Sequence, residues 1–153
     1  MSRNFFIGTL AILLIIGFLQ FVYKTPLPVA ATAEFGGVSL ILGYATTEAE
    51  REKGLSGRTS VPSDYGMLFV FQKEDYYGFW MKDMLVPIDI FWLDSQGQVV
   101  SIAEDVTVST YPSVFYPNMP VRYVLETAAG FSRAHSVATG TPLLLKNFPT
   151  VSE

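Results

Sequence analysis

Apolar residues recur in short runs along residues 38–146, and turn-forming residues separate the runs. The runs are rich in β-branched and aromatic side chains, with Gly, Pro, Asp and Ser between them, which is typical of strands. We expect strands at 38–45, 67–71, 78–82, 89–94, 99–106, 121–129 and 142–146, and a helical turn at 130–136. This pattern predicts a mainly β fold, a small jelly-roll-like β-sandwich or barrel with one or two short helices.

Two connections carry recognisable local signals. Thr47 followed by Glu50 forms a capping box, and Gly54 can end a helix, so a short helix is expected over residues 46–54. A glycine within residues 94–98 predicts a hairpin between the strands on either side.

The N-terminal pattern is different. Residues 5–22 carry no charge, and an apolar run of about 18 residues is long enough to span a bilayer. We therefore expect residues 1–24 to be a membrane anchor or a signal sequence. We favour an uncleaved transmembrane helix, because the run exceeds the roughly 7–15 residues of a signal-peptide core. Arg3 before the span then places the folded domain on the extracytoplasmic side.

The remaining chain divides by composition. Residues 25–36, with prolines and glycines, have the composition of a linker. Residues 37–148 are expected to form the β-rich domain, and residues 149–153 a C-terminal tail.

Charge and composition exclude several classes of function. Without Arg3 and Lys24, 8 basic residues face 14 acidic ones, a net charge of −6, so nucleic acid is not an expected partner. The absence of cysteine excludes disulfides, thiol nucleophiles and zinc–thiolate sites, and the single histidine excludes a multi-histidine metal site. No phosphate-binding or hydrolase motif is present, so we expect no cofactor and no metal, and no catalytic residue can be named.

The segment 76–94 places charges inside two aromatic-rich apolar runs. Because side chains alternate along a strand, Trp80 and Lys82 are expected to share one face, and Met81 and Asp83 the other. An indole beside an ammonium group is a plausible wall for a polar ligand.

A second charged pair lies in the strand expected at 121–129. Arg122 and Glu126 share a face but lie roughly 13 Å apart, so each needs another partner. Asp89 is a candidate for Arg122, and Lys82 for Glu126 or Asp83. Either these are structural ion pairs, or Trp80 and the four charged residues line one pocket. A third alternative is that the charges simply reach solvent.

The loop 107–121 is the other candidate site. It contains the aromatic residues Tyr111, Phe115 and Tyr116 and three prolines, and its length is typical of a lid or binding loop. Tyr111 and Tyr116 could contact a ligand or a partner protein. The alternative is that these aromatics only cover the open end of the sandwich.

Several segments resemble the domain-of-unknown-function family 192. They are EREKGLSGR (50–58), GMLFVF (66–71), FWMKDMLVPIDIFWLD (79–94), YP (116–117) and VRYVLETAAG (121–130), with a glycine near 140. The resemblance implies a compact, jelly-roll-like β fold in small prokaryotic proteins that are often exported or membrane-anchored. It implies no activity, because the family is uncharacterised. Asp83 is a departure, since the family usually has asparagine after FWMK.

Three hypotheses follow. The first is a binding module for a small polar ligand, such as a glycan or cell-wall fragment. The second is a hydrolase acting on envelope components through Asp89 and Glu126, which requires the two carboxyl groups to lie about 5–9.5 Å apart across one cleft. The third is an interaction protein that docks an envelope partner through residues 107–121. We favour the binding module.

Overall fold

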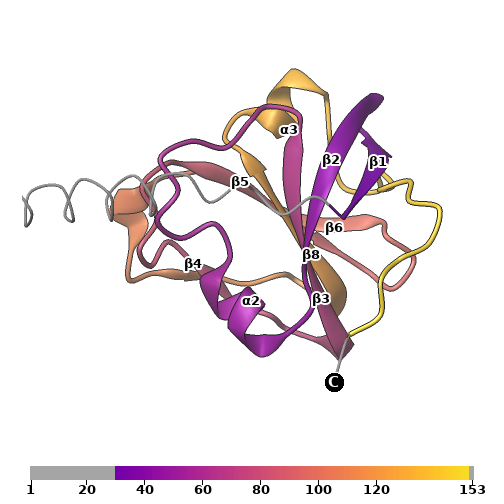
Figure 1. The fold of residues 1–153 in the computed structure, drawn as a ribbon, viewed down its shortest axis with the longest axis horizontal. Coiled ribbons are helices and arrows are strands. Elements are labelled where there is room, and N and C mark those ends of the chain that lie inside the picture. The colour runs from indigo at the N-terminus through magenta and orange to yellow at the C-terminus, as the bar shows by residue number, and fades with distance from the viewer. Residues whose placement is uncertain (1–29, 152–153) are drawn as a thin grey trace, which may run out of the picture.

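The computed structural model describes residues 30–151 (Figure 1). Its strands are β1 (Ala31–Phe35), β2 (Val38–Ala45), β3 (Tyr65–Asp75), β4 (Phe79–Trp80), β5 (Ile88–Leu93), β6 (Val99–Val106), β7 (Val114–Phe115) and β8 (Val121–Ala128). Its helices are α2 (Glu48–Lys53), α3 (Phe131–Ala134) and the 3₁₀ turn η1 (Val108–Thr110). The mainly β class with two short α-helices is confirmed.

Six strands form one mixed sheet in the order β1-β2-β3-β8-β5-β6, and β4 and β7 form a separate two-stranded ribbon. Strands β2 and β3 are parallel, so a crossover, residues 46–64, connects them and carries α2. The other paired strands are antiparallel. The hairpin expected at 94–98 is confirmed between β5 and β6.

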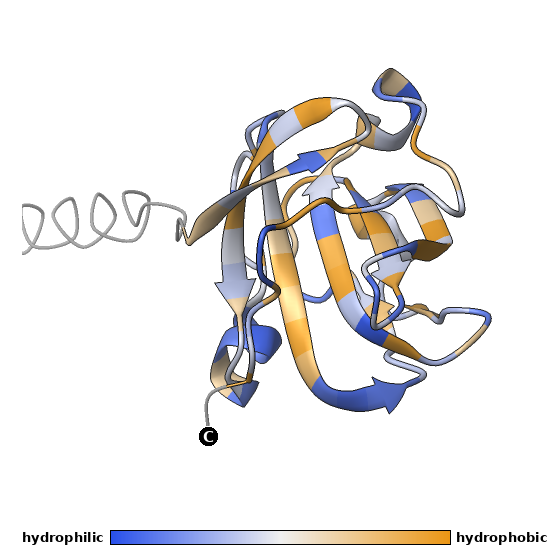
Figure 2. Cartoon of the chain, turned by 90° about the vertical axis from the view of Figure 1, so that its right-hand side faces the viewer, coloured by the Kyte–Doolittle hydropathy of each residue, from blue (hydrophilic) through white to orange (hydrophobic). Residues whose placement is uncertain are grey.

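Both faces of the large sheet are buried. Alternate residues of the central strands enter two separate apolar clusters: Leu68 and Leu125 belong to the first, Met67 and Val124 to the second. A strand buried on both faces needs apolar residues at successive positions, which explains runs such as MLFVF. Figure 2 shows the apolar strand interiors in orange.

Different segments cover the two faces. The first face packs against α3 and the C-terminal segment, through Phe131, Val137 and Leu143. The second packs against Leu55 after α2 and against Met81 and Met84 after β4. The second face matters for function, because the loops that cover it leave a cavity.

The sheets are not closed into a barrel, which corrects the barrel alternative of the prediction. Strands β1 and β6 are the two edges of the large sheet and do not pair with each other. Residues 140–144 run between them as a strap: Leu144 bridges Glu34 of β1, and Pro142 bridges Gln98 beside β6. Only isolated bridges form where a strand at 142–146 was predicted, because residues 140–143 bond to Gly97 and Val99 at one edge and Leu144 then bonds to Glu34 at the other.

Two further boundaries differ from the predictions. Residues 31–35, assigned to the linker, form β1, because the extended segment ATAEF pairs with β2 and buries Ala33 and Phe35. Residues 149–153 were expected to be a tail, yet Val151 packs against the first apolar cluster. In both cases packing against the sheet outweighs local composition.

The predicted anchor at residues 5–22 lies outside the described residues. Between residues 30 and 151, none of the helices combines the length and the apolar character that crossing a bilayer requires.

Candidate functional site

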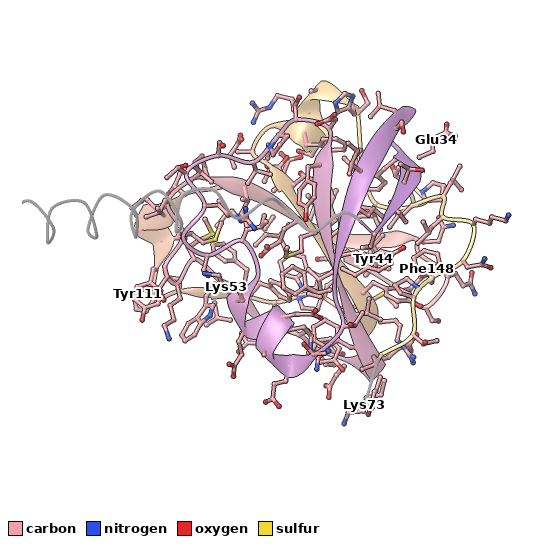
Figure 3. All side chains as sticks on the ribbon, viewed as in Figure 1. Glu34, Tyr44, Lys53, Lys73, Tyr111 and Phe148 are labelled. Atoms are coloured by element: carbon pink, nitrogen blue, oxygen red, sulfur yellow. The ribbon has the colours of Figure 1, made fainter. Side chains whose placement is uncertain are left out.

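A cleft of about 780 Å³ lies on the second face of the sheet. Residues from 48–57 form one wall and residues from 77–84 the other, and its floor contains Phe69 and Phe71 of β3 and Glu126 of β8. Segments that are far apart in the sequence therefore meet at this cleft. Lys53 of α2, labelled in Figure 3, is one of the lining residues.

Helix α2 forms the first wall because its ends are fixed while its surface stays polar. The Thr47 hydroxyl accepts from the Glu50 N–H at 3.2 Å, and the Glu50 carboxylate accepts from the Thr47 N–H at 2.9 Å, so the predicted capping box is confirmed. The hydrogen bonds that the Glu50 carboxylate accepts lower its pKa, and the bond from the Thr47 backbone N–H has the largest effect. No residue of α2 is buried, so the helix contributes no apolar side chain that would fill the cleft.

The turn after α2 is joined to the opposite wall. The Ser56 hydroxyl donates to the Lys82 carbonyl at 3.1 Å, and the Gly57 N–H donates to the Asp83 carbonyl at 2.8 Å. Asp83 has φ of +57°, a left-handed conformation that Asn and Asp adopt more readily than other side chains. The aspartate found here and the asparagine of the family pattern both suit this conformation, so the departure at Asp83 is compatible with the backbone geometry.

Aromatic side chains line the second wall and the floor. Phe79 meets Phe69 edge to face at 4.8 Å between ring centroids, and Tyr77 stacks on Phe71 at 3.5 Å. The Trp92 indole N–H donates to the Tyr77 carbonyl at 2.8 Å and fixes the start of this wall.

Trp80 and Lys82 stand together at the rim, as predicted. The Lys82 ammonium lies 5.8 Å from the Trp80 ring centroid, within range of a cation–π interaction. Met81 between them is buried, so the expected alternation holds through Lys82. It ends at Asp83, where the chain turns instead of continuing the strand predicted at 78–82.

Glu126 is the unusual residue of the floor. It is only 5% exposed, its Oε2 atom has no hydrogen-bond partner, and the predicted ion pair with Lys82 is not among the salt bridges of the described residues. Burial raises the pKa of its carboxyl group to about 8. A buried polar atom without a partner costs free energy, commonly about 1–3 kcal/mol, so its retention calls for an explanation.

The walls carry equal numbers of basic and acidic side chains. The basic residues are Arg51, Lys53 and Lys82, and the acidic residues are Glu48, Glu52 and Asp83. Arg51 donates to the carbonyls of Thr46 and Val70 at 2.7 and 3.0 Å. Its guanidinium carbon also lies 5.3 Å from the Phe71 ring centroid.

Asp89 lies on the opposite face of the sheet. It pairs with Thr127 whereas Glu126 pairs with Ile90, so the two carboxyl groups point to opposite sides. The Asp89 carboxylate accepts from the backbone N–H groups of Asp105, Gly130 and Ser132 at 2.8, 3.1 and 2.8 Å. It fixes the start of α3, and the expected pair with Arg122 does not form.

The other three predicted residues lie outside the cleft lining. Arg122 is half-buried, and its Nε atom has no partner. Tyr111 and Tyr116 are 47% and 62% exposed. The Tyr111 ring lies 5.7 Å from that of Trp80, and the Tyr116 ring packs so close to Gly78 that a Cβ there would lie 2.5 Å from it. The loop 107–121 therefore borders the rim, with η1 and β7 as its ordered parts.

Three of the seven predicted residues, Trp80, Lys82 and Glu126, thus meet at one cleft. Sequence reasoning missed the wall formed by residues 48–57 and the floor residues Phe69 and Phe71. One signal was available: the helix EAEREK has no apolar stripe, so it could not be a core helix. Among the described residues, no group of three acidic or histidine side chains is placed to hold a metal ion.

Comparisons with known proteins support the fold. The model of the domain-of-unknown-function family 192, described as "Uncharacterized ACR", matches residues 31–145. A crystal structure from Sinorhizobium meliloti, described as a "putative transcription regulator", is 27% identical, with a TM-score of 0.70 over 78% of this chain and 96% of that one. A protein of unknown function from Novosphingobium aromaticivorans is 24% identical, with a TM-score of 0.69 over 81% and 96%. No curated protein matches the chain significantly.

Proposed function

The chain belongs to the domain-of-unknown-function family 192, for which no activity is assigned, and from the geometry of its cleft we propose that it is a binding module for a small polar ligand. The observation that carries this proposal is the buried Oε2 atom of Glu126, which has no hydrogen-bond partner, on the floor of an aromatic cleft. Ligand sites are commonly concave and largely apolar, with a few polar groups that fix orientation.

Several features of the cleft support binding. A volume of about 780 Å³ is in the range of small-molecule sites. The hydrogen bonds from Ser56 and Gly57 to the opposite wall hold it open at a defined width. The exposed indole of Trp80 offers a flat apolar surface beside the Lys82 ammonium.

The two alternatives have less support. A hydrolase acting through Asp89 and Glu126 needs both carboxyl groups in one cleft, and they lie on opposite faces of the sheet. Docking of an envelope partner through residues 107–121 remains the second candidate, because Tyr111 and Tyr116 are exposed beside the rim. The net charge of −4 does not favour binding to nucleic-acid phosphates, which weighs against a regulator role like the one named for the Sinorhizobium meliloti protein.

Location is part of the proposal. The apolar segment 5–22 would hold the domain at the extracytoplasmic side of a membrane, where glycan and cell-wall fragments are available as ligands.

A thermal-shift screen of the full-length chain against sugars, peptidoglycan fragments, amino acids, nucleotides and amines tests the proposal. A ligand that binds only the folded state raises the melting temperature by mass action. Lys82→Ala should leave the melting temperature of the free protein nearly unchanged, because Lys82 is exposed, but should weaken or abolish the ligand shift. Lys73→Ala is the matched control, since Lys73 is exposed and outside the cleft.

The outcomes separate the hypotheses. A ligand shift that both lysine variants retain would place binding outside the cleft. No shift from any compound would overturn the binding module and favour docking through residues 107–121.

A further inference from the structure

We propose that the cleft selects a ligand bearing an ammonium group, and that Glu126 is the residue that recognises this group. The inference rests on the proposed ligand-binding function and specifies its chemical class. It is carried by three features of the cleft: the polar groups that are already occupied, the aromatic surroundings of Glu126, and the balance of charge at the opening.

Three polar side chains of the walls already have hydrogen-bond partners within the protein. The Ser56 hydroxyl donates to the Lys82 carbonyl, and the Tyr77 hydroxyl donates to the Lys73 carbonyl at 2.8 Å. Arg51 donates to two backbone carbonyls. Glu126 is the buried lining residue whose side chain retains an unpartnered atom, so the floor offers a ligand one strong acceptor.

A single acceptor among aromatic rings fits an ammonium group better than a sugar ring. A sugar presents several hydroxyl groups, and each would need a partner when buried. An ammonium group needs a carboxylate and gains further from the faces of aromatic rings. Glu126 and the aromatic residues Phe69 and Phe79 lie in the same cleft and can supply both kinds of contact.

The charged groups around Glu126 do not supply the missing cation. On α2, Arg51 and Lys53 are matched by Glu48 and Glu52, and at the other wall Lys82 is matched by Asp83. Burial alone accounts for the raised pKa of Glu126, with no contribution from these residues. The strands on either side of Glu126 place the uncharged residues Met67 and Ile90 next to it. The carboxyl group therefore lacks a counter-ion that a ligand can provide.

The test compares two probes of the same shape and different charge. Choline and its neutral isostere 3,3-dimethyl-1-butanol are titrated into the full-length chain by calorimetry and by NMR. Ethanolamine is added as a primary ammonium probe. We expect choline or ethanolamine to bind at least tenfold more tightly than the neutral isostere. Glu126→Gln should remove this preference, whereas Glu104→Gln, an exposed carboxylate away from the cleft, should retain it.

The pH dependence provides a second readout. An ammonium ligand binds the ionised carboxylate, so its affinity should rise by up to about tenfold per pH unit below pH 8 and level off above it. Choline keeps its charge over this range, so the change reports on the protein. The neutral isostere should show no such rise.

Each outcome decides between the two proposals. Equal affinities for the charged and neutral probes, affinity that falls with rising pH, or an unaltered preference in Glu126→Gln would overturn the ammonium inference. If neither ammonium probe binds while a neutral compound from the wider screen does, the inference fails and the binding module stands. If no compound binds at all, both fail.

Discussion

Asp89 and Glu126 are both buried carboxylic acids of the central sheet, but their hydrogen bonding differs. Asp89 accepts three backbone hydrogen bonds, whereas Oε2 of Glu126 accepts none. Their strands are adjacent, and the alternation of side chains sends one to each face. A carboxylate that accepts several N–H groups stabilises the fold. One without partners has a cost that a bound ligand can offset.

Glu126→Gln should make stability less dependent on pH. The pKa of Glu126 is raised to about 8 in the folded state, so the folded protein keeps a proton that the unfolded chain releases near pH 4.5. Wild-type stability should therefore fall as the pH rises from about 5 to 8, and the variant should lack this fall. We expect the variant to be more stable by on the order of 2 kcal/mol at pH 8. Urea denaturation at pH 5 and pH 8 measures the difference, and equal pH slopes would contradict it.

Asp89→Asn should destabilise the domain at every pH at which it is folded. The amide nitrogen replaces an acceptor oxygen with a donor, so at least one of the backbone N–H groups of Asp105, Gly130 and Ser132 loses its partner. Such a loss costs about 2–3 kcal/mol when the acceptor is charged. Chemical denaturation should show this loss, and ligand binding should persist wherever the variant is folded. Unchanged stability would contradict the structural role.

At the scale of elements, the crossover from β2 to β3 forms one wall of the cleft. Helix α2 buries no side chain, and Leu55, 1% exposed, is its nearest core contact. Gly54, with φ of +45°, lets the chain turn from the helix into this contact, and a Cβ there would lie 3.1 Å from the Phe69 ring. Leu55, the hydrogen bonds from Ser56 and Gly57 to the opposite wall, and the Arg51 contacts with β3 thus position this wall.

Leu55→Ala should release this wall. Removing a fully buried leucine commonly costs about 2–5 kcal/mol. We expect amide hydrogens of residues 48–57 to exchange faster in the variant than in the wild type. Those of β8 should exchange slowest in both proteins and remain protected as long as the domain is folded. Hydrogen-exchange mass spectrometry measures this, with Ala49→Gly, at an exposed position of α2, as a control for helix propensity alone. Uniformly faster exchange would show that Leu55 belongs to the global core instead.

Most elements were predictable because local signals and tertiary packing agree. The capping box at Thr47 and the hairpin at 94–98 are short-range patterns, and both are confirmed. The strand predicted at 78–82 shortens to Phe79–Trp80, and a strand at 31–35 was missed. Pairing partners decide these cases, and a partner distant in sequence leaves no local mark.

At the scale of the molecule, the strap at residues 140–144 connects the two edges of the sheet, and the residues that follow it pack against the first apolar cluster. Phe148 stacks on Tyr123 of β8 with ring centroids 4.7 Å apart, and its ring fits against Gly97, where a Cβ would lie 2.4 Å away. The last residues of the described chain therefore belong to the folded unit.

Phe148→Ala should weaken the whole domain. Its ring is half-buried, so we expect a loss of roughly 2 kcal/mol in the free energy of unfolding, below the 3–5 kcal/mol of a fully buried phenylalanine. Leu144→Ala is the matched control, because Leu144 is exposed and bonds to β1 through its backbone. Guanidinium denaturation of both variants measures the difference. Equal losses would mean that the strap is held by its backbone alone.

The candidate site was predictable only in part, for a reason of scale. Trp80, Lys82 and Glu126 stand out in the sequence because charge or exposed aromatic surface interrupts apolar runs. Asp89 gives the same local signal, yet its role depends on which face of the sheet it occupies and which backbone N–H groups surround it. Residues such as Phe69 look like any core position, and only the empty space beside them makes them part of a cleft.

Because β2 and β3 are parallel, the residues that form the sheet and the residues that form this wall of the cleft are separate parts of the chain. The crossover connects the end of one strand to the start of the next, and Arg51, through the Val70 carbonyl, is the residue of α2 whose side chain bonds to the described sheet. Substitutions at Glu48 and Ala49, which are exposed, line the cleft and precede the family-like segment 50–58, can therefore accumulate without loss of the fold. We expect relatives to keep the sheet and to differ at these positions, so that ligand preference diverges faster than architecture.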